Sequence, residues 1–371
     1  MIVELQEVSN VIMGQSPKGE SYNDKKIGLP LLNGAADYKG KDFKPKYYTS
    51  EPTRIARKGD ILLGVRATIG NFTFSDNEYC IGRGVAAIRV DENKADKGYV
   101  IKCVEKGLNE IIHTLSGSTI KGIRKEDLTE MKLNLPPLPK QQKIAKILDA
   151  ADALRQNDKA LIAKYDELTQ ALFLDMFGDP VSNNLNLPFP KIKEFTNVSQ
   201  GMQIAIKDRH KENGPNRYKY LTVAYLNGRK EEEFIENPRA SVICNTDEIL
   251  MIRTGNTGQV ITNVEGVFHN NFFKINWDKS KLNKNYLVHF LSNQVIRREL
   301  LKRASTTTIP DLSHGQFYDL NIIVPSIDLQ EQFAQRLAVI EEQKAIAKKS
   351  LEKSEELFNS LLQKAFKGEI M

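Results

Sequence analysis

The chain of 371 residues contains one sequence pattern twice, with the second copy 187 to 189 positions after the first. Residues 5–11 align without a gap to residues 192–198. Further matches follow in the same order: Gly14 with Gly201, 59–62 with 247–250, 118–120 with 307–309, and Leu135 with Val324. A period of half the chain excludes a solenoid of short repeats and predicts a duplicated unit of one domain and one helix. Such a duplication can place two similar surfaces about a pseudo-twofold axis.

The composition favours two ordinary globular domains. A hydrophobic content of 40% supports real cores, and 371 residues suffice for two of them. No apolar run approaches the ~18 residues that a membrane span needs, so we expect no membrane segment. The three cysteines lie far apart in the sequence, which is typical of reduced thiols in a cytoplasmic protein.

Positive charge is concentrated in the two globular segments. Residues 1–137 carry 21 Lys and Arg against 18 Asp and Glu, and residues 181–325 carry 19 against 14. Such an excess suits a polyanionic partner, and duplex DNA also has a twofold symmetry that matches the duplication. The charge is modest, however, and is common in proteins that bind no nucleic acid.

Short β-type runs, broken by Gly, Pro and Asn, occur in both globular segments. Examples are residues 61–63, 85–88 and 131–135 in the first copy, and 249–252, 272–275 and 322–324 in the second. One short helix is expected in each copy, around 99–108 and 286–301. We interpret each segment as an α+β domain with a curved, mostly antiparallel sheet.

A long helix is predicted after the prolines that end each domain. Residues 140–177 and 328–366 contain no interior Pro or Gly, and ~38 residues of helix extend roughly 57 Å. Apolar residues at a and d spacing predict a coiled-coil seam, which we expect to pair antiparallel with the domains at opposite ends. Arg155 and Lys344 are equivalent polar breaks in the seam, with Asp158, Thr169 and Ser354 as further breaks. Such residues either fix the register or mark a locally exposed section.

No catalytic or metal-binding motif is present in the sequence. A phosphate-binding G-x-x-x-x-G-K-[ST] run, a G-x-S-x-G elbow and metal-type spacing of His and Cys are all absent. We therefore expect no catalytic residues, no metal and no cofactor in this chain, which favours a recognition or scaffold role.

Two further features carry a resemblance to a known family. Residues 136–145 (PPLPKQQKIA) lead into the first long helix, and 324–333 (VPSIDLQEQF) form a weaker second copy with one proline. The helices end in similar runs, 176–179 (MFGD) and 365–369 (AFKGE). With the duplication, these runs make the chain resemble, over essentially its full length, the specificity subunit of type I restriction–modification systems.

The resemblance implies a non-catalytic subunit with four segments. Residues 1–139 and 181–327 would be target recognition domains, each reading one half of a split, asymmetric sequence in double-stranded DNA. Residues 140–180 and 328–371 would be spacer helices that pair as an antiparallel coiled coil. Two methyltransferase subunits would dock on the helices and supply S-adenosylmethionine binding and adenine N6 methylation, and motor–nuclease subunits would join for restriction.

Candidate DNA contacts lie in loops of the two globular segments. Arginine can pair with guanine, asparagine with adenine, and hydroxyl-rich loops suit phosphate contacts. The candidates in the first copy are Arg66, Thr68, Asn71, Arg83, Ser118, Thr119 and Lys121. Those in the second copy are Arg253, Asn256, Thr257, Asn270, Thr306, Thr307 and Thr308. The repeated framework and the position of the loops favour a DNA-facing role for Arg66 and Arg253 in particular.

Two alternatives stay open from the sequence. The chain could be the recognition subunit of another restriction type, or a coiled-coil scaffold that joins proteins without DNA. A steep fall of DNA affinity with salt would separate recognition from scaffolding.

Overall fold

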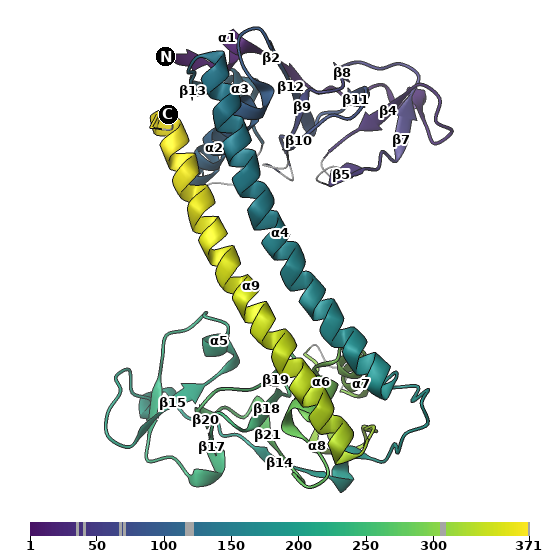
Figure 1. Ribbon diagram of the computed structural model, residues 1–371, viewed down its shortest axis with the longest axis vertical. Helices are drawn as coiled ribbons and strands as arrows, with labels where there is room; N and C mark the ends of the chain where they lie inside the picture. The colour runs from purple at the N-terminus through teal and green to yellow at the C-terminus, as the bar shows by residue number, and fades with distance from the viewer. Residues whose placement is uncertain are drawn as a thin grey trace. The chain divides into compact units, whose positions relative to one another are not determined.

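The computed structural model describes residues 1–34, 37–39, 42–66, 69, 72–115, 122–304 and 309–369. The chain divides into two compact units, which are described separately. The first comprises Met1–Lys159 together with Lys349–Met371, and the second comprises Ala160–Lys348. Each unit thus contains one globular domain and parts of both long helices (Figure 1).

The first unit is built mainly of short strands. Its strands are β1 (Ile2–Glu4), β2 (Ser9–Met13), β3 (Tyr22–Asn23), β4 (Leu29–Leu32), β5 (Tyr38–Lys39), β6 (Asp42–Phe43), β7 (Tyr47–Thr49), β8 (Ile55–Ala56), β9 (Ile61–Gly64), β10 (Phe72–Phe74), β11 (Tyr79–Ile81), β12 (Val85–Val90) and β13 (Lys132–Asn134). Its helical elements are α1 (Leu5–Val8), η1 (Gly19–Ser21), α2 (Lys97–Leu115), α3 (Lys125–Thr129), the first part of α4 (Leu138–Phe177) and the last part of α9 (Ile327–Lys367).

The second unit repeats much of this order with fewer strands. Its strands are β14 (Thr196–Gln200), β15 (Arg217–Leu221), β16 (Phe234–Glu236), β17 (Ile243–Cys244), β18 (Ile249–Ile252), β19 (Val260–Ile261), β20 (Gly266–Phe268) and β21 (Phe272–Trp277). Its helical elements are the last part of α4, η3 (Ile192–Glu194), η4 (Ile206–Asp208), α5 (Val223–Leu226), η5 (Ala240–Val242), α6 (Lys284–Ser292), α7 (Gln294–Arg303), α8 (His314–Tyr318) and the first part of α9.

The sheets confirm the α+β fold class and show one difference from the prediction. Each unit has two main sheets where the sequence suggested one. The orders β10-β9-β12-β2 and β19-β18-β21-β14 are equivalent and wholly antiparallel. The second sheets, β3-β7-β4-β11-β8 and β16-β15-β20-β17, share one parallel pair, β4 with β11 and β15 with β20. The duplication in sequence is therefore a duplication of topology.

Two local predictions were wrong in the second unit. The single helix expected over 286–301 is two helices, because Asn293 has an extended backbone and its side chain caps α7 by accepting from the Val295 N–H. The strand expected over 322–324 forms no regular ladder. The N–H groups of Ile322 and Val324 donate to the carbonyls of Pro190 and Pro188. Because proline has no N–H group, the two prolines cannot donate the hydrogen bonds that would complete a strand ladder. In the first unit, β1 and β13 pair regularly at the matching place.

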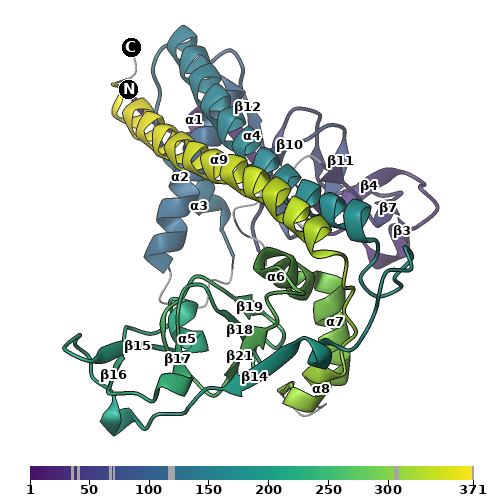
Figure 2. The same ribbon diagram turned by 60° about the horizontal axis from the view of Figure 1, so that its bottom comes forward.

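The core of each unit lies between the wholly antiparallel sheet and its helices. In the first unit, α2 packs on this sheet through Tyr99, Val100 and Val104, and both long helices contribute to the same cluster. In the second unit, α6, α7 and α8 cover the sheet (Figure 2). A cluster of rings, among them Phe173 of α4 and Phe333 of α9, ties the long helices to this core. The helices are thus anchored on the domains by buried apolar surface.

Within each unit, the portions of α4 and α9 pair antiparallel, as predicted (Figure 1). In the first unit, the Ser354 hydroxyl donates to the buried Asp158 carboxylate at 2.8 Å, and Arg155 stacks on the Phe358 ring at 4.3 Å. In the second unit, Lys344 pairs with Asp166. The polar breaks in the seam therefore have partners and are not simply exposed. The four segment boundaries inferred from the sequence stay a prediction.

Candidate nucleic-acid interface

Three chain segments meet at one end of the antiparallel sheet in the first unit. They are Val65 after β9, the turn of residues 82–84 before β12, and Ile123. The Val65 N–H donates to the Gly84 carbonyl at 3.0 Å, and the Ile123 N–H donates to the Val65 carbonyl at 2.8 Å. Two predicted contacts, Arg66 and Arg83, therefore adjoin one backbone framework, which Ile123 joins from a third stretch of the sequence.

The second unit repeats this framework. The Arg253 N–H donates to the Asn271 carbonyl at 2.8 Å, and the Leu312 N–H donates to the Arg253 carbonyl at 2.9 Å. Arg253, Asn271 and Leu312 thus occupy the places of Val65, Gly84 and Ile123. The two units share a scaffold that carries different side chains.

Gly14 and Gly201 show why this scaffold is repeated in the sequence. A Cβ atom on Gly14 would lie 2.2 Å from the Gly82 carbonyl oxygen, and one on Gly201 would lie 2.3 Å from the His269 oxygen. Both distances are too short for two atoms that are not bonded to each other. The strands β2 and β14 therefore end at a glycine because the turn before β12 or β21 passes directly against the backbone.

Arg83 and Asn270 occupy the same position in the two turns. Arg83 is exposed, and its Nε lies 3.4 Å from the Ser16 hydroxyl. Asn270 Nδ2 lies 3.5 Å from Gln203 Oε1, while its Oδ1 is buried with no hydrogen bond to a described residue. Ser16 and Gln203 each lie two residues after the repeated glycine. Their place in the repeat could have identified them from the sequence, but the prediction missed them.

Arg66 and Arg253 lie in corresponding loops of the two units but not at equivalent positions. Backbone hydrogen bonds place Arg253 opposite Val65, so Arg66 corresponds to Thr254. Arg66 is exposed, whereas Arg253 forms a two-point ion pair with Asp311. In this pair Nε donates to Oδ1 at 3.0 Å and Nη2 donates to Oδ2 at 2.6 Å. The bonds from Arg253 hold the pKa of Asp311 below its usual range.

Thr257 differs from the other described candidates because it is buried. Its side chain is 1% exposed, and its hydroxyl lies 2.7 Å from the Pro310 carbonyl and 3.1 Å from the Arg253 carbonyl. A group so placed holds the loop together and cannot reach a ligand on the surface. Asn256, its neighbour, is exposed.

The other predicted contacts lie outside the described residues. They are Thr68, Asn71, Ser118, Thr119, Lys121, Thr306, Thr307 and Thr308. Described neighbours place the ends of these segments: Gly122 and Ile123 follow one of them, and Ile309 follows another. Their proposed contacts stay predictions.

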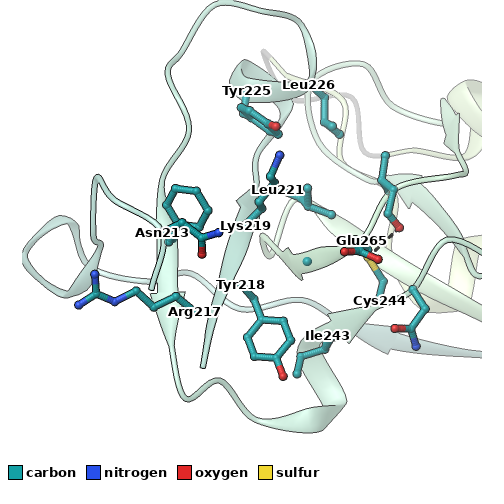
Figure 3. Close-up of a pocket in the computed structure, with 14 residues that line it drawn as sticks. Asn213, Arg217, Tyr218, Lys219, Leu221, Tyr225, Leu226, Ile243, Cys244 and Glu265 are labelled. Carbon is teal, nitrogen blue, oxygen red and sulfur yellow. Dashed lines mark hydrogen bonds between the residues drawn. The ribbon is translucent and has the colours of Figure 1, made fainter. Parts of the chain in front are cut away.

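The second unit also has a half-open pocket beside β15 (Figure 3). Lys219 points toward Tyr225 there, and both bond to Glu232 Oε1, at 2.7 and 3.0 Å. Burial raises the pKa of the Cys244 thiol in its wall to about 11, which disfavours a reactive thiolate. None of the residues that line this pocket belongs to the loop framework around Arg253. The lining residues also include no nucleophile paired with a base.

Two other kinds of site, a metal centre and a membrane-spanning helix, are not found in the described part of the chain. No group of three His, Cys, Asp or Glu residues there could hold a metal ion. Among the helices that the structure describes, none is long and apolar enough to cross a membrane.

Comparison with known proteins gives one consistent family. The model of the type I restriction modification DNA specificity domain matches residues 1–164 and again 188–356. A Methanocaldococcus jannaschii protein, provisionally described as the type I restriction enzyme MjaX specificity subunit, is 35% identical over 178 residues. That alignment covers 47% of this chain and 42% of the relative, so it spans less than half the relative's length.

Two solved structures share the fold over nearly the whole chain. The S subunit of a type I restriction–modification system from M. genitalium has a TM-score of 0.60 at 18% identity, with 99% of this chain and 96% of that chain covered. A chain from a structural study of complex assembly and conformational transition in the type I R-M system has a TM-score of 0.58 at 15% identity. Coverage is 100% of this chain and 98% of that one.

Proposed function

Because the chain belongs to the type I restriction modification DNA specificity family, we propose that it is the subunit that recognises DNA for its complex. Each unit reads one half of a split target through its loop framework. The single observation that carries this proposal is the shared backbone junction at Val65 and Arg253, which supports different side chains in the two units.

The differences between the two frameworks support an asymmetric target. One turn presents Arg83 beside Ser16, and the other presents Asn270 beside Gln203. Arginine suits guanine O6 and N7, while Asn and Gln suit adenine N6 and N7. Two loop frameworks with the same backbone but different side chains would select two different half-sites.

The paired helices would set the gap between the half-sites. Their aromatic and apolar anchors fix each helix on its domain, and helical rods keep a constant rise of about 1.5 Å per residue. We further propose that the helices dock two methyltransferase subunits, which bind S-adenosylmethionine and methylate adenine N6. Motor–nuclease subunits would join these for restriction, and this chain would itself catalyse nothing.

Salt-dependent binding of DNA tests the recognition role. The full chain would be co-purified with its methyltransferase partner, and the affinity for a duplex carrying the target would be measured from 50 to 200 mM salt. Several phosphate contacts should lower the affinity steeply, by roughly 1000-fold or more when six or more phosphates are neutralised. A complex whose DNA binding is absent or insensitive to salt would favour the protein scaffold instead. A DNA-binding complex that restricts with another type of nuclease would keep the recognition role and change the system.

A further inference from the structure

The Arg253–Asp311 ion pair sits within the loop framework of the second unit. Its two hydrogen bonds, at 3.0 and 2.6 Å, join residues 58 positions apart, and the Thr254 hydroxyl donates to the same carboxylate. The Arg253 backbone N–H bonds to the turn that carries Asn270, and exposed Asn256 follows in the same loop. The guanidinium therefore lies among the candidate DNA contacts.

The fold does not require this pair. The first unit makes the same backbone junction with Val65 and Gly122 in place of Arg253 and Asp311. A Cβ on Gly122 would lie 2.9 Å from the Val65 carbonyl oxygen, so the first unit has no room for an aspartate there. The side chains of Arg253 and Asp311 are also 22% and 36% exposed, and exposed ion pairs add little stability. The Arg253–Asp311 ion pair therefore has no counterpart at the equivalent positions, Val65 and Gly122, of the first unit.

The geometry leaves part of the guanidinium for a ligand. Nε and Nη2 bond to the carboxylate, and Nη1 makes no hydrogen bond to any residue that the structure describes. When a carboxylate binds one edge of a guanidinium group, the orientation of the guanidinium plane is fixed. The remaining N–H donors can then bind a second planar acceptor. Guanine, with O6 and N7 on its major-groove edge, is the base that matches them.

We propose that Arg253 reads one guanine in the half-site bound by the second unit, and that Asp311 is the positioning residue that fixes the plane of its guanidinium. The inference rests on the proposed DNA-recognition function and adds a specific base contact to it. Asp311 would influence the base through Arg253, so its loss should loosen selection at one base pair without altering the other half-site.

The test compares variants of the full chain in complex with its methyltransferase partner. Methylation rates would be measured on duplexes in which each base pair of both half-sites is varied in turn. In Asp311→Asn, discrimination at one guanine of the second half-site should fall roughly tenfold or more. Arg253→Lys keeps the positive charge but removes the planar group that can donate two parallel hydrogen bonds. This variant should lose discrimination at the same base pair.

Glu248→Gln is the matched control. It breaks the ion pair with Lys274, at 2.8 Å, near the opposite end of β18. A merely structural role for Asp311 would reduce methylation of all second half-site variants equally, as a general loss of folding in Glu248→Gln would. The inferred role instead changes the preference at one position only.

Each outcome decides the inference. Unchanged discrimination in Asp311→Asn or in Arg253→Lys would overturn it while the unaltered complex still methylates a split motif, which leaves the proposed function intact. Thermal unfolding would reveal a misfolded Asp311→Asn chain, and Arg253→Lys would then decide alone. If the unaltered complex methylates no split motif, the proposed function itself is wrong.

Discussion

At the scale of single residues, one buried glutamine connects the start of each long helix to the domain before it. Gln330 is fully buried; its Oε1 accepts from the Asn283 N–H at 2.8 Å, and its Nε2 lies 2.9 Å from the carbonyls of Lys281 and Pro325. Gln141 makes the matching bonds to Asp96 and Pro136 in the first unit. Each glutamine thus fixes where a helix leaves its domain.

Replacing Gln330 with alanine should lower the free energy of unfolding by about 1–3 kcal/mol, because it leaves buried backbone groups without partners. Urea unfolding followed by circular dichroism measures this change. Gln332→Ala is the control, since Gln332 lies two residues along the same helix and is exposed. Equal stability of the two variants would show that the buried bonds contribute nothing.

The sequence repeat matches Gly14 with Gly201, and the same repeat aligns Gln141 with Gln330, because the spacing is preserved through regular elements. It did not give the hydrogen-bond partners of the two glutamines, which lie up to 49 residues away in sequence. Nor did the repeat show that Arg253 pairs with Asp311, because the two residues lie 58 positions apart in the sequence. The burial of Thr257 also has no local signal, since its surroundings in the sequence are polar.

At the scale of elements, periodicity predicted the long helices well and the short strands less well. An uninterrupted apolar pattern determines a helix locally, whereas strand pairing depends on partners elsewhere. Pro188 and Pro190 prevented a regular ladder at residues 322–324, although that segment by itself has strand-like composition. The helix seam was predicted with its polar breaks, but not with the partners that satisfy them.

The Asp158–Ser354 contact offers a test of the seam. Asp158 and Ser354 are only 8% and 3% exposed, so Ser354→Ala should cost about 1–3 kcal/mol by removing a donor from a buried carboxylate. Leucine at both positions should restore or exceed the original stability, because the polar pair fixes register at the expense of stability. Thermal and urea unfolding provide the measurement.

Glu355→Gln serves as the control for this series. It breaks the neighbouring Lys159–Glu355 ion pair, which joins the same helices at 3.1 Å but is nearly half exposed. The expected change is below about 1 kcal/mol. A larger loss in Glu355→Gln than in Ser354→Ala would contradict the assignment of the buried pair as the stronger link.

At the scale of the whole molecule, the duplication explains why one chain carries two related frameworks. The sequence was sufficient to predict this organisation, because framework glycines and helix starts recur at nearly constant spacing. It could not predict the bases recognised, which depend on loop geometry and on DNA deformation.

The spacer proposal predicts the result of a paired deletion. Removing residues 160–166 of α4 together with 344–350 of α9 takes one heptad from each helix and removes both partners of the Lys344–Asp166 ion pair. Seven residues correspond to about 10 Å of helix, or roughly three base pairs. Methylated-site mapping should show a shorter gap between unchanged half-sites. New half-sites with the original gap would contradict the spacer role.

The central claim is that this chain selects a split DNA sequence for adenine methylation. Modified-base sequencing of genomic DNA from cells with and without the gene, with its partner subunits expressed, tests that claim most directly. The proposal predicts that N6-methyladenine disappears from one split, asymmetric motif when the gene is absent. An unchanged pattern of methylation would contradict it and would point to a scaffold that joins protein partners.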